Sequence, residues 1–291
     1  MTPERLKDSK EALGWFAAEY TVLLASVRLA AEKEFDECAW QIPWTMRHFQ
    51  DWQGHWHDWA ALQPLALAAA TRLGDVAGQA VTCRLAASAC DRIGDDVQAR
   101  TRLTTALRLY RQLGDRIGEA RTHQGLGLIC EAQQRYDEGL EHDEQALALF
   151  RAAGHRLGQA QILNNLGYAH IQLGNPQRGR AYCRQGLTLS RELGDRVGEA
   201  HAWDSLGFAE HELERNKQAA SCYRRAIRLH NDPGHRFMQA WTLDRLGDAC
   251  NAISDAQGAQ GAWRQAIAIL DELRHPAAEQ IRAKLIVHPA E

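Results

Sequence analysis

The sequence lacks any apolar run long enough to cross a membrane, because a spanning helix needs about twenty consecutive apolar residues and no stretch approaches that length. Met1-Thr2-Pro3-Glu4 does not begin as a secretory signal peptide does. We therefore expect a cytoplasmic protein that does not bind membranes. The chain also lacks a basic surplus, since 34 basic and 37 acidic residues give a net charge of -3. This balance argues against direct binding to nucleic acid.

Catalytic motifs are missing as well. The sequence contains no Gly-x-Ser-x-Gly, no His-Glu-x-x-His and no glycine-rich phosphate loop. His201, Asp204 and His211 come closest to a ligand set, because His201 and Asp204 share a helix face and His211 follows seven residues after Asp204. A structural or solvated role is the more common one for such residues. We predict that the chain is not an enzyme and has no cofactor and no bound metal.

The seven cysteines form no Cys-x-x-Cys pair, which argues against a zinc or redox site. Three of them, Cys90, Cys130 and Cys250, recur at one repeat position, where His170 and Glu210 stand in other repeats. An odd number of scattered thiols fits a reducing compartment in which cysteine serves as a small buried apolar residue.

What the sequence does have is a period of forty residues. Gly74, Gly114, Gly154, Gly194 and Gly234 stand at equal intervals, and a Leu-Gly pair recurs at 126–127, 166–167, 206–207 and 246–247. Self-similarity of this kind is typical of a solenoid, in which each unit buries its apolar face by stacking on its neighbours.

Each period reads as two amphipathic helices of about seventeen or eighteen residues with apolar residues at spacings of three and four. The helices end at a glycine and begin again at an aspartate N-cap, as in Gly74-Asp75, Gly114-Asp115 and Gly194-Asp195. Gly174-Asn175-Pro176 predicts an asparagine cap followed by proline at the first helical position. His155 and His235 replace the aspartate, so we expect weaker caps there.

The glycines of the Leu-Gly pairs lie in the middle of a helix, where glycine costs about 1 kcal/mol relative to alanine. Gly127, Gly167, Gly207 and Gly247 each occupy this position. We predict that the second helix of the same unit passes too close to allow a side chain.

The pattern resembles the tetratricopeptide repeat: Leu206-Gly207, Ala219, Tyr223 and Ala226 fit its spacing, as do Leu246-Gly247, Ala259, Trp263 and Ala266. Asp143 and Cys183 depart from it, because the family prefers a large aromatic there. The resemblance implies an all-α, right-handed superhelical solenoid of antiparallel helix pairs with a forty-residue repeat. We divide the chain into an N-terminal helical segment with a divergent, tryptophan-rich repeat (1–80), five repeats (81–120, 121–160, 161–200, 201–240 and 241–280) and a C-terminal capping tail (281–291).

A narrower resemblance links the chain to actinobacterial transcriptional activators of the SARP/AfsR type, on the sequence Glu11-Ala12-Leu13-Gly14-Trp15-Phe16-Ala17-Ala18-Glu19-Tyr20 and the repeated Leu-Gly-Asp-Arg-x-Gly-Glu-Ala. In that family a winged-helix DNA-binding domain and an NTPase module precede such repeats. No Gly-x-x-x-x-Gly-Lys sequence occurs here. The resemblance implies the sensor and interaction end of a larger regulator.

The first eighty residues contain six of the nine tryptophans. His48, Asp51 and His55 in the same stretch have poor spacing for a metal. We expect the aromatics to pack the end of the solenoid or to form an interface, with self-association as one outcome, through Trp44, Trp52, Trp56 and Trp59. Pro43 and Pro64 are expected to kink or interrupt these helices.

The family resemblance also places residues on the concave face, which the first helix of each unit lines. Transferred to this sequence, these positions are Arg84 and Ser88, then Arg121, Gln124 and Leu128, then Gln161, Asn164 and Tyr168, then His201, Asp204, Phe208 and His211, then Trp241, Asp244, Asp248 and Asn251. Arginines come early and aspartates late, so the groove would complement a segment with acidic residues at one end and basic residues at the other. An ordinary solvated helix face explains the same list equally well.

Two functions follow from these observations. The first is a non-catalytic interaction module that holds a protein or peptide segment in the groove, including the upstream DNA-binding or NTPase domains of the same regulator. The alternative is a sensor that binds a peptide or small metabolite inside the superhelix.

Overall fold

The computed structural model describes residues 7–229, 236–273 and 275–287. These residues form fourteen α-helices, and none of them lies in a strand. The chain divides into two compact units, residues 1–129 and 130–291. Each unit is a stack of helices and is described by itself.

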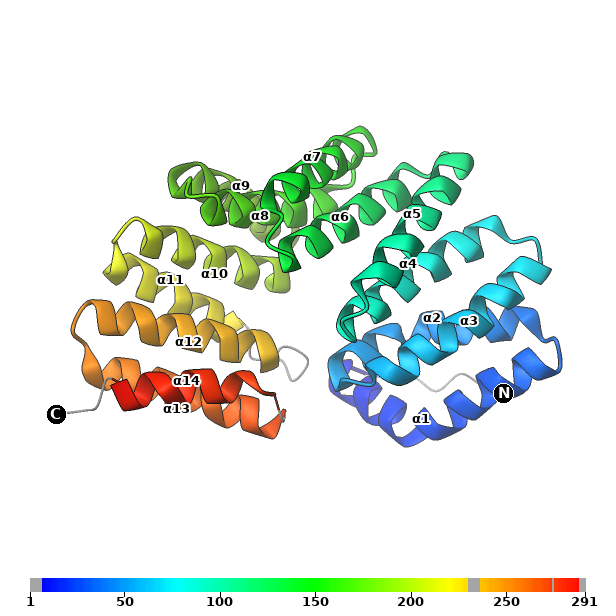
Figure 1. The fold of residues 1–291 in the computed structure, drawn as a ribbon, viewed down its shortest axis with the longest axis horizontal. Coiled ribbons are helices and arrows are strands. Elements are labelled where there is room, and N and C mark those ends of the chain that lie inside the picture. The colour runs from blue at the N-terminus through cyan, green and yellow to red at the C-terminus, as the bar shows by residue number, and fades with distance from the viewer. Residues whose placement is uncertain (1–6, 230–235, 274, 288–291) are drawn as a thin grey trace. The chain divides into compact units, whose positions relative to one another are not determined.

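The first unit contains five complete helices and most of a sixth, which continues into the second unit: α1 (Ser9–Glu32), α2 (Asp36–Gln53), α3 (Trp56–Arg72), α4 (Val76–Arg92), α5 (Asp96–Leu113) and α6 (Arg116–Ala132). Helices α2 and α3 pack as a pair, as α4 and α5 do (Figure 1). The helix pair α2–α3 lies forty residues before α4–α5, so the repeat already operates in the tryptophan-rich segment.

The second unit continues the same pattern and ends in a short helix: α7 (Tyr136–Ala152), α8 (Arg156–Gln172), α9 (Pro176–Leu193), α10 (Arg196–Glu212), α11 (Asn216–Leu229), α12 (Arg236–Ala252), α13 (Ala256–Glu272) and α14 (Ala277–Val287). Helices α8 and α9, α10 and α11, and α12 and α13 form antiparallel pairs, and α10 also contacts both α8 and α12. The first helices of the pairs are therefore neighbours. The predicted all-α solenoid of helix pairs is confirmed.

The helices begin where the caps predict. Asp75, Asp115 and Asp195 accept the backbone N–H of the residue three positions on at 2.8, 2.9 and 3.0 Å. As a result the first helix of each pair begins about five residues before the block boundaries that we drew from the repeats; α8, for example, begins at Arg156 rather than at 161. Gly74, Gly114, Gly154 and Gly194 have positive φ of 63–67°, as a helix-ending glycine requires; Gly234 lies outside the described residues.

His155 occupies the cap position of the aspartates, and its Nδ1 accepts the N–H of Gly158 at 3.0 Å. The weakness of this cap stays a prediction, whereas the cap at Asn175 needs correction. Asn175 occupies the N-cap position before Pro176 but makes no side-chain cap bond. Its amide donates instead to the carbonyl of Leu173 at 3.2 Å. His235, the other substituted cap, lies outside the described residues.

The close approach at the mid-helix glycines is confirmed in three repeats. A Cβ on Gly207 would lie 2.5 Å from Cε1 of Tyr223 on α11, the second helix of the same pair. Gly247 faces the indole of Trp263 in the same way, and Gly167 faces Cys183. At Gly207 and Gly247 the missing side chain of the first helix makes room for a large aromatic side chain of the second.

Other local expectations fare differently. Neither proline interrupts a helix, since Pro43 lies inside α2 and Pro64 lies inside α3.

Of the cysteines, Cys83, Cys130, Cys183 and Cys250 are buried, whereas Cys38 is exposed. The description of cysteine as a buried apolar residue is therefore wrong for Cys38, which lies near the start of α2.

Candidate functional site

The forty-residue period places side chains from successive first helices in rows. In the second unit one row consists of Asn164 on α8, Asp204 on α10, Asp244 on α12 and Lys284 on α14. A second row, four residues further along each helix, consists of Tyr168, Phe208 and Asp248. Because the first helices are neighbours, the rows bring residues together that are far apart in the sequence.

Four residues of these rows line a pocket of about 380 Å³. Six of the residues predicted for the groove line it: Tyr168, Phe208, His211, Trp241, Asp244 and Asp248. Gln172, Glu212, Tyr223 and Arg245 complete the lining. The pocket combines four aromatic rings with ionisable groups, a composition typical of ligand sites.

Arg245 organises the wall of the pocket. Its guanidinium pairs with the carboxylate of Asp204 and lies 5.0 Å from the ring centroid of Phe208 and 5.6 Å from that of Tyr168. Burial alone would lower the pKa of Arg245, but the charge of Asp204 acts together with Tyr223 and Tyr168 in the opposite direction, and the pKa is raised. Arg245 therefore stays charged and holds the two rings in place through cation–π contacts.

Asp204 was predicted as a free charge of an acidic groove, and this expectation needs correction. Its side chain is buried, with 5% of its surface exposed, and it faces Arg245. A carboxylate in this position neutralises a buried cation and cannot serve as an exposed attachment point for a ligand.

Asp244 and Asp248 are also paired. Lys284 Nζ donates to Asp244 Oδ1 at 2.7 Å and to both carboxylate oxygens of Asp248 at 2.8 Å. Trp263 Nε1 adds a hydrogen bond to Asp248 at 3.3 Å. Burial raises the pKa of Asp244, against the opposing effect of Lys284. The predicted acidic end is thus largely neutralised by Arg245 and Lys284, two cations that sequence reasoning missed.

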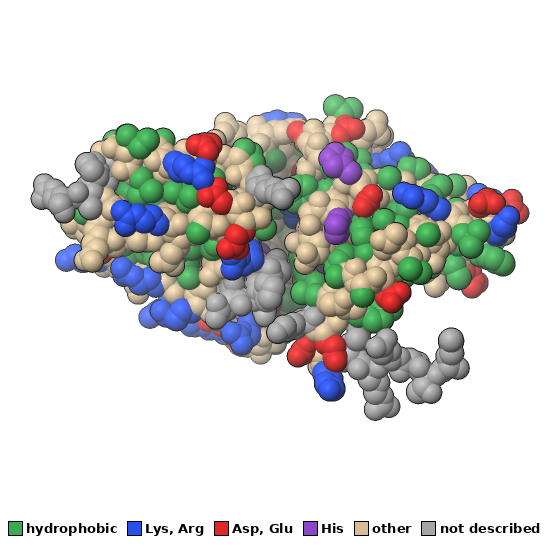
Figure 2. Space-filling view, turned by 90° about the horizontal axis from the view of Figure 1, so that it is seen from below, with side chains coloured by type: hydrophobic (Ala, Val, Ile, Leu, Met, Phe, Trp, Pro, Cys, Tyr) green, Lys and Arg blue, Asp and Glu red, His purple; other side chains and the backbone are tan. Residues whose placement is uncertain are grey.

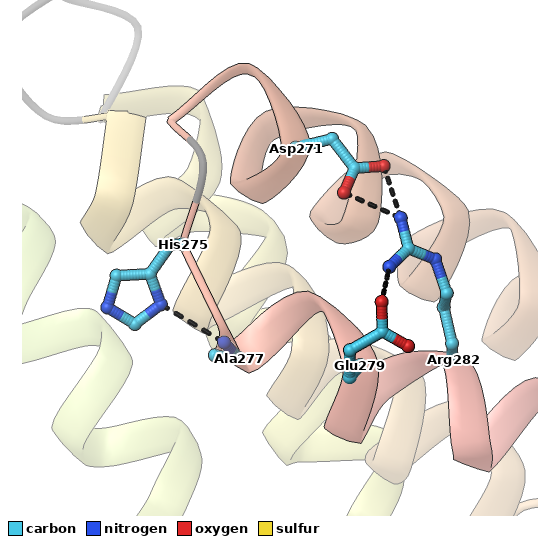
Figure 3. Close-up of polar contacts among 5 residues, drawn as sticks. All are labelled: Asp271, His275, Ala277, Glu279 and Arg282. Carbon is cyan, nitrogen blue, oxygen red and sulfur yellow. Dashed lines mark hydrogen bonds and ion pairs between the residues drawn. The ribbon is translucent and has the colours of Figure 1, made fainter.

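Helix α14 brings Lys284 to this position. Arg282 donates to both carboxylate oxygens of Asp271 on α13 at 2.6 Å and pairs with Glu279 within its own helix. His275 Nδ1 accepts the N–H of Ala277 at 3.2 Å at the start of the helix (Figure 3). These contacts fix α14 against α13, so the segment predicted as a capping tail supplies the cation that pairs with Asp244 and Asp248.

The other predicted residues of the second unit lie outside the pocket. Asn164 is half-buried on α8, and its Oδ1 is buried without a hydrogen-bond partner among the described residues. His201 is half-buried on α10. His211 lines the pocket and shares a hydrogen bond of 2.6 Å with Asn216. His201, Asp204 and His211 therefore have separate surroundings, and no metal-binding group of side chains occurs in the part of the chain that the structure describes.

A second acidic group lies elsewhere in this unit. Burial raises the pKa of Glu131 to about 7, while the charge of Arg245 acts in the opposite direction. Asp143 is buried, and burial, together with the charge of Glu131, raises its pKa well above the usual range. Asp143 occupies the repeat position where Tyr223 and Trp263 stand, so a carboxylate replaces the aromatic side chain there.

Other residues predicted for the groove belong to the first unit. Arg84 lies on α4, and Arg121 and Gln124 lie on α6. Trp44 and Arg84 occupy the repeat position of the first row, because Trp44 precedes Arg84 by forty residues and Arg84 precedes Asn164 by eighty.

The four tryptophans predicted as an N-terminal interface separate into two groups. Trp44 and Trp52 are each 41% exposed. Trp59 is only 4% exposed and packs with Leu85 and Ala89, and Trp56 packs against the same cluster. The prediction of an interface role is therefore wrong for Trp59, which is a core residue. Phe35 is a further exposed aromatic residue of this unit, at 65%. Figure 2 shows hydrophobic side chains at the surface among charged ones.

No described helix is long and apolar enough to cross a membrane. A search of curated protein sequences finds no match for this chain.

Solved structures with similar folds include regulators and sensors. A Rap protein complexed with Competence and Sporulation Factor is 12% identical, with 98% of this chain and 87% of that chain covered and a TM-score of 0.67. The Rap conjugation gene regulator of plasmid pLS20, in complex with the Phr* peptide, is 12% identical over 92% of this chain and 79% of that chain, with a TM-score of 0.67.

A Signal Transduction ATPase with Numerous Domains from Pyrococcus horikoshii, which has a tetratricopeptide repeat sensor, is 13% identical with a TM-score of 0.64. The match covers 98% of this chain and 45% of that chain. At these identities the likeness concerns the fold alone.

The sequence itself identifies the family. The family model described as tetratricopeptide repeat matches residues 79–152, 118–178 and 158–232, which together span more than half of the chain. The helix pairs, the Leu-Gly contacts and the rows of side chains on the first helices agree with this match. The chain belongs to the tetratricopeptide repeat family.

Proposed function

We propose that the chain is a non-catalytic binding module that holds a peptide, or a segment of a protein, in the pocket formed by α8, α10 and α12. The observation that carries this proposal is the pocket itself, which brings six of the residues predicted for the groove around one volume of about 380 Å³. Trp241 is 36% exposed there and stacks on Phe237, with 6.0 Å between the ring centroids. An indole supported from one side and open on the other is a suitable anchor for an apolar side chain.

The charges of the pocket refine the choice of ligand. Since Lys284 and Arg245 offset two of the three negative charges of the aspartates, the ligand does not need a compensating run of basic residues. We infer a segment with an apolar or aromatic anchor and with backbone groups that bond to the rim. The complex of the pLS20 Rap regulator with the Phr* peptide supports a peptide as ligand, because that protein shares the fold.

The cellular setting belongs to the same proposal. The resemblance of residues 11–20 to SARP/AfsR-type activators, together with the sensor of the Pyrococcus horikoshii protein and the gene regulator of pLS20, supports a role as the sensor end of a bacterial transcriptional regulator. Its partners would include the DNA-binding and NTPase domains of such a regulator, in the cytoplasm. Self-association would use the exposed Trp44 and Trp52.

A peptide-display selection on the immobilised full chain tests the proposal. Peptides that are enriched should lose affinity by about thirtyfold or more for Trp241→Ala, because a buried aromatic anchor contributes roughly 2 kcal/mol or more. Thr188→Ala, an exposed change on the second helix α9, is the matched control. Peptides that bind Trp241→Ala and the unchanged chain equally well would show that the pocket is not the binding site.

The volume of the pocket also favours a second candidate, a sensor for a small metabolite, because drug-sized ligands occupy cavities of about 300–1,000 Å³. A thermal-shift screen separates the two. A metabolite at a hundred times its dissociation constant should stabilise the chain by about 2.7 kcal/mol. A compound of this kind should lose its effect in Trp241→Ala, and the absence of any such compound leaves the peptide as the ligand.

A further inference from the structure

Three arginines on the first helices of successive pairs in residues 1–129 lie near enough for their positive charges to act on one another. Arg47 lies on α2, Arg84 on α4 and Arg121 on α6, and α2 packs directly against α4. Arg47 and Arg84 are half-buried, and Arg121 is exposed. Burial lowers the pKa of Arg47, and the positive charges of Arg84 and Arg121 lower it further. Burial and the charge of Arg84 lower the pKa of Arg121 in the same way.

None of the three arginines forms an ion pair within the described residues. Asp51 pairs with Arg92 at 2.8 Å. The charge of Asp115 opposes the lowering of the pKa of Arg121, but the Asp115 carboxylate caps α6 by accepting the backbone N–H groups of Ile117 and Gly118 at 3.0 and 2.9 Å. No carboxylate among the described residues therefore forms an ion pair with the cluster.

The side chains of the cluster are also positioned. Arg47 Nη1 donates to the carbonyl of Trp44 at 2.7 Å, and its guanidinium lies 5.1 Å from the ring centroid of Trp44. Arg84 Nε is buried and has no hydrogen-bond partner among the described residues. A buried donor without a partner, beside two like charges, destabilises the folded chain unless an acceptor binds there.

We propose that Arg47, Arg84 and Arg121 form a binding site for an oxyanion, a phosphate or a carboxylate group, carried by a ligand of this protein. The guanidinium fork donates two parallel hydrogen bonds to such groups, and three forks from three helices would surround one anion. Trp44 provides an apolar wall for the part of the ligand next to the anion. The site lies wholly within residues 1–129 and does not depend on the pocket of the second unit.

Inorganic phosphate is the first probe, tested on the full chain by thermal unfolding and calorimetric titration at constant ionic strength against chloride. Phosphate should raise the melting temperature more than chloride does. Arg84→Gln and Arg121→Gln should each weaken the apparent affinity by roughly tenfold or more, because a hydrogen bond to a charged group contributes about 1.5–3 kcal/mol. Arg116→Gln, an exposed arginine on the same helix as Arg121, should leave the affinity unchanged.

A hexaglutamate peptide is the second probe and separates the two sources of the oxyanion. Binding of phosphate alone assigns a phosphorylated ligand, and binding of the peptide alone assigns a carboxylate; both are lost in Arg84→Gln. If neither probe exceeds chloride, or if Arg116→Gln lowers affinity as much as Arg84→Gln, the proposal is overturned.

Stability without ligand gives an independent check. At low ionic strength and without phosphate, Arg84→Gln should melt at the same temperature as the unchanged chain or higher, because one of three repelling charges is gone. A clear fall in melting temperature would assign Arg84 a structural role instead and overturn the proposal. Trp241→Ala should keep the phosphate response, which distinguishes this site from the proposed peptide pocket.

Discussion

The inner faces of residues 1–129 and of residues 130–291 use the same repeat positions but balance their charges differently. In the second unit Arg245, beside the pocket, pairs with Asp204, and Lys284 pairs with Asp244 and Asp248. In the first unit Arg84 and Arg121 have no carboxylate partner among the described residues. One repeat scaffold can therefore carry one face whose cations are paired with carboxylates and another face whose arginines form no ion pair among the described residues.

The two units also fill the same helix crossing with different side chains. In α4 and α5 the pair is Ala87 and Leu103, which belong to one buried cluster. In α10 and α11 the pair is Gly207 and Tyr223. A larger side chain on the second helix accompanies a smaller one on the first, so the crossing keeps its spacing while its residues change.

The largest effect should come from breaking the charge balance of the second unit. Asp204→Ala leaves Arg245 buried without its partner and should lower the free energy of unfolding by about 3–5 kcal/mol. The double change Asp204→Ala with Arg245→Met should recover part of this loss, because no buried charge remains. Urea unfolding followed by circular dichroism gives both values. A loss below about 1 kcal/mol for Asp204→Ala would contradict the role that we assign to the pair.

The packing comparison predicts a smaller effect. Gly207→Ala should cost about 1–3 kcal/mol, because its Cβ would overlap the ring of Tyr223, although alanine is the better helix former. Gly261→Ala on α13 is the matched control, since a Cβ there meets nothing within 4 Å. It should stabilise the chain by up to about 1 kcal/mol. Two changes of equal sign in urea unfolding would refute the explanation from close approach.

The buried acids of the second unit predict a dependence of stability on pH. Because the pKa of Glu131 is about 7 in the folded chain against 4.5 ordinarily, the folded state binds more protons than the unfolded state between these values. The free energy of unfolding should therefore fall as the pH rises from about 4.5 to 7, by up to about 1.4 kcal/mol per unit of the pKa difference. Asp143 contributes in the same direction.

Glu131→Gln should make stability vary less over this range, while Glu144→Gln, an exposed change on α7, should not. Urea unfolding at pH 5 and pH 7.5 measures the difference. An unchanged pH dependence in Glu131→Gln would place the titrating group elsewhere.

The smallest effect is one of rate rather than stability. Cys38 is exposed, whereas burial raises the pKa of the thiols of Cys83, Cys90, Cys183, Cys222 and Cys250. A thiol reagent should therefore label about one cysteine per chain in a fast phase, and Cys38→Ser should remove that phase. Fast labelling of all seven thiols in the folded chain would contradict the burial that we describe.

Much of the fold could be predicted from the sequence because the signals are local and repeated. Gly74, Gly114 and Gly194 with their aspartate caps mark helix ends, and the Leu-Gly pairs mark the crossings. Where one signal stood alone the prediction failed, as at Asn175, whose amide turns to the carbonyl of Leu173. The same holds for Pro64, which lies inside a continuous helix.

The site was only partly predictable. The aromatic residues Tyr168, Phe208 and Trp241 follow from the family positions, and the structure places them around one pocket. Arg245 was missed because its position holds Gly125, Asn165 and Ser205 in other repeats, so no periodic signal marks it. Lys284 was missed because its segment was read as a tail, although its place forty residues after Asp244 was a usable signal.

The rows of the second unit also set a spacing for whatever binds along them. Neighbouring helices pack about 8–10 Å apart, so each row offers one side chain per such interval. A polyproline II segment advances about 9 Å in three residues and returns each third side chain to the same face. A peptide bound across α8, α10 and α12 should thus contact the rows with every third side chain. Enriched peptides should then prefer prolines and carry their anchor residues at intervals of three, which would show that the helix spacing selects the ligand.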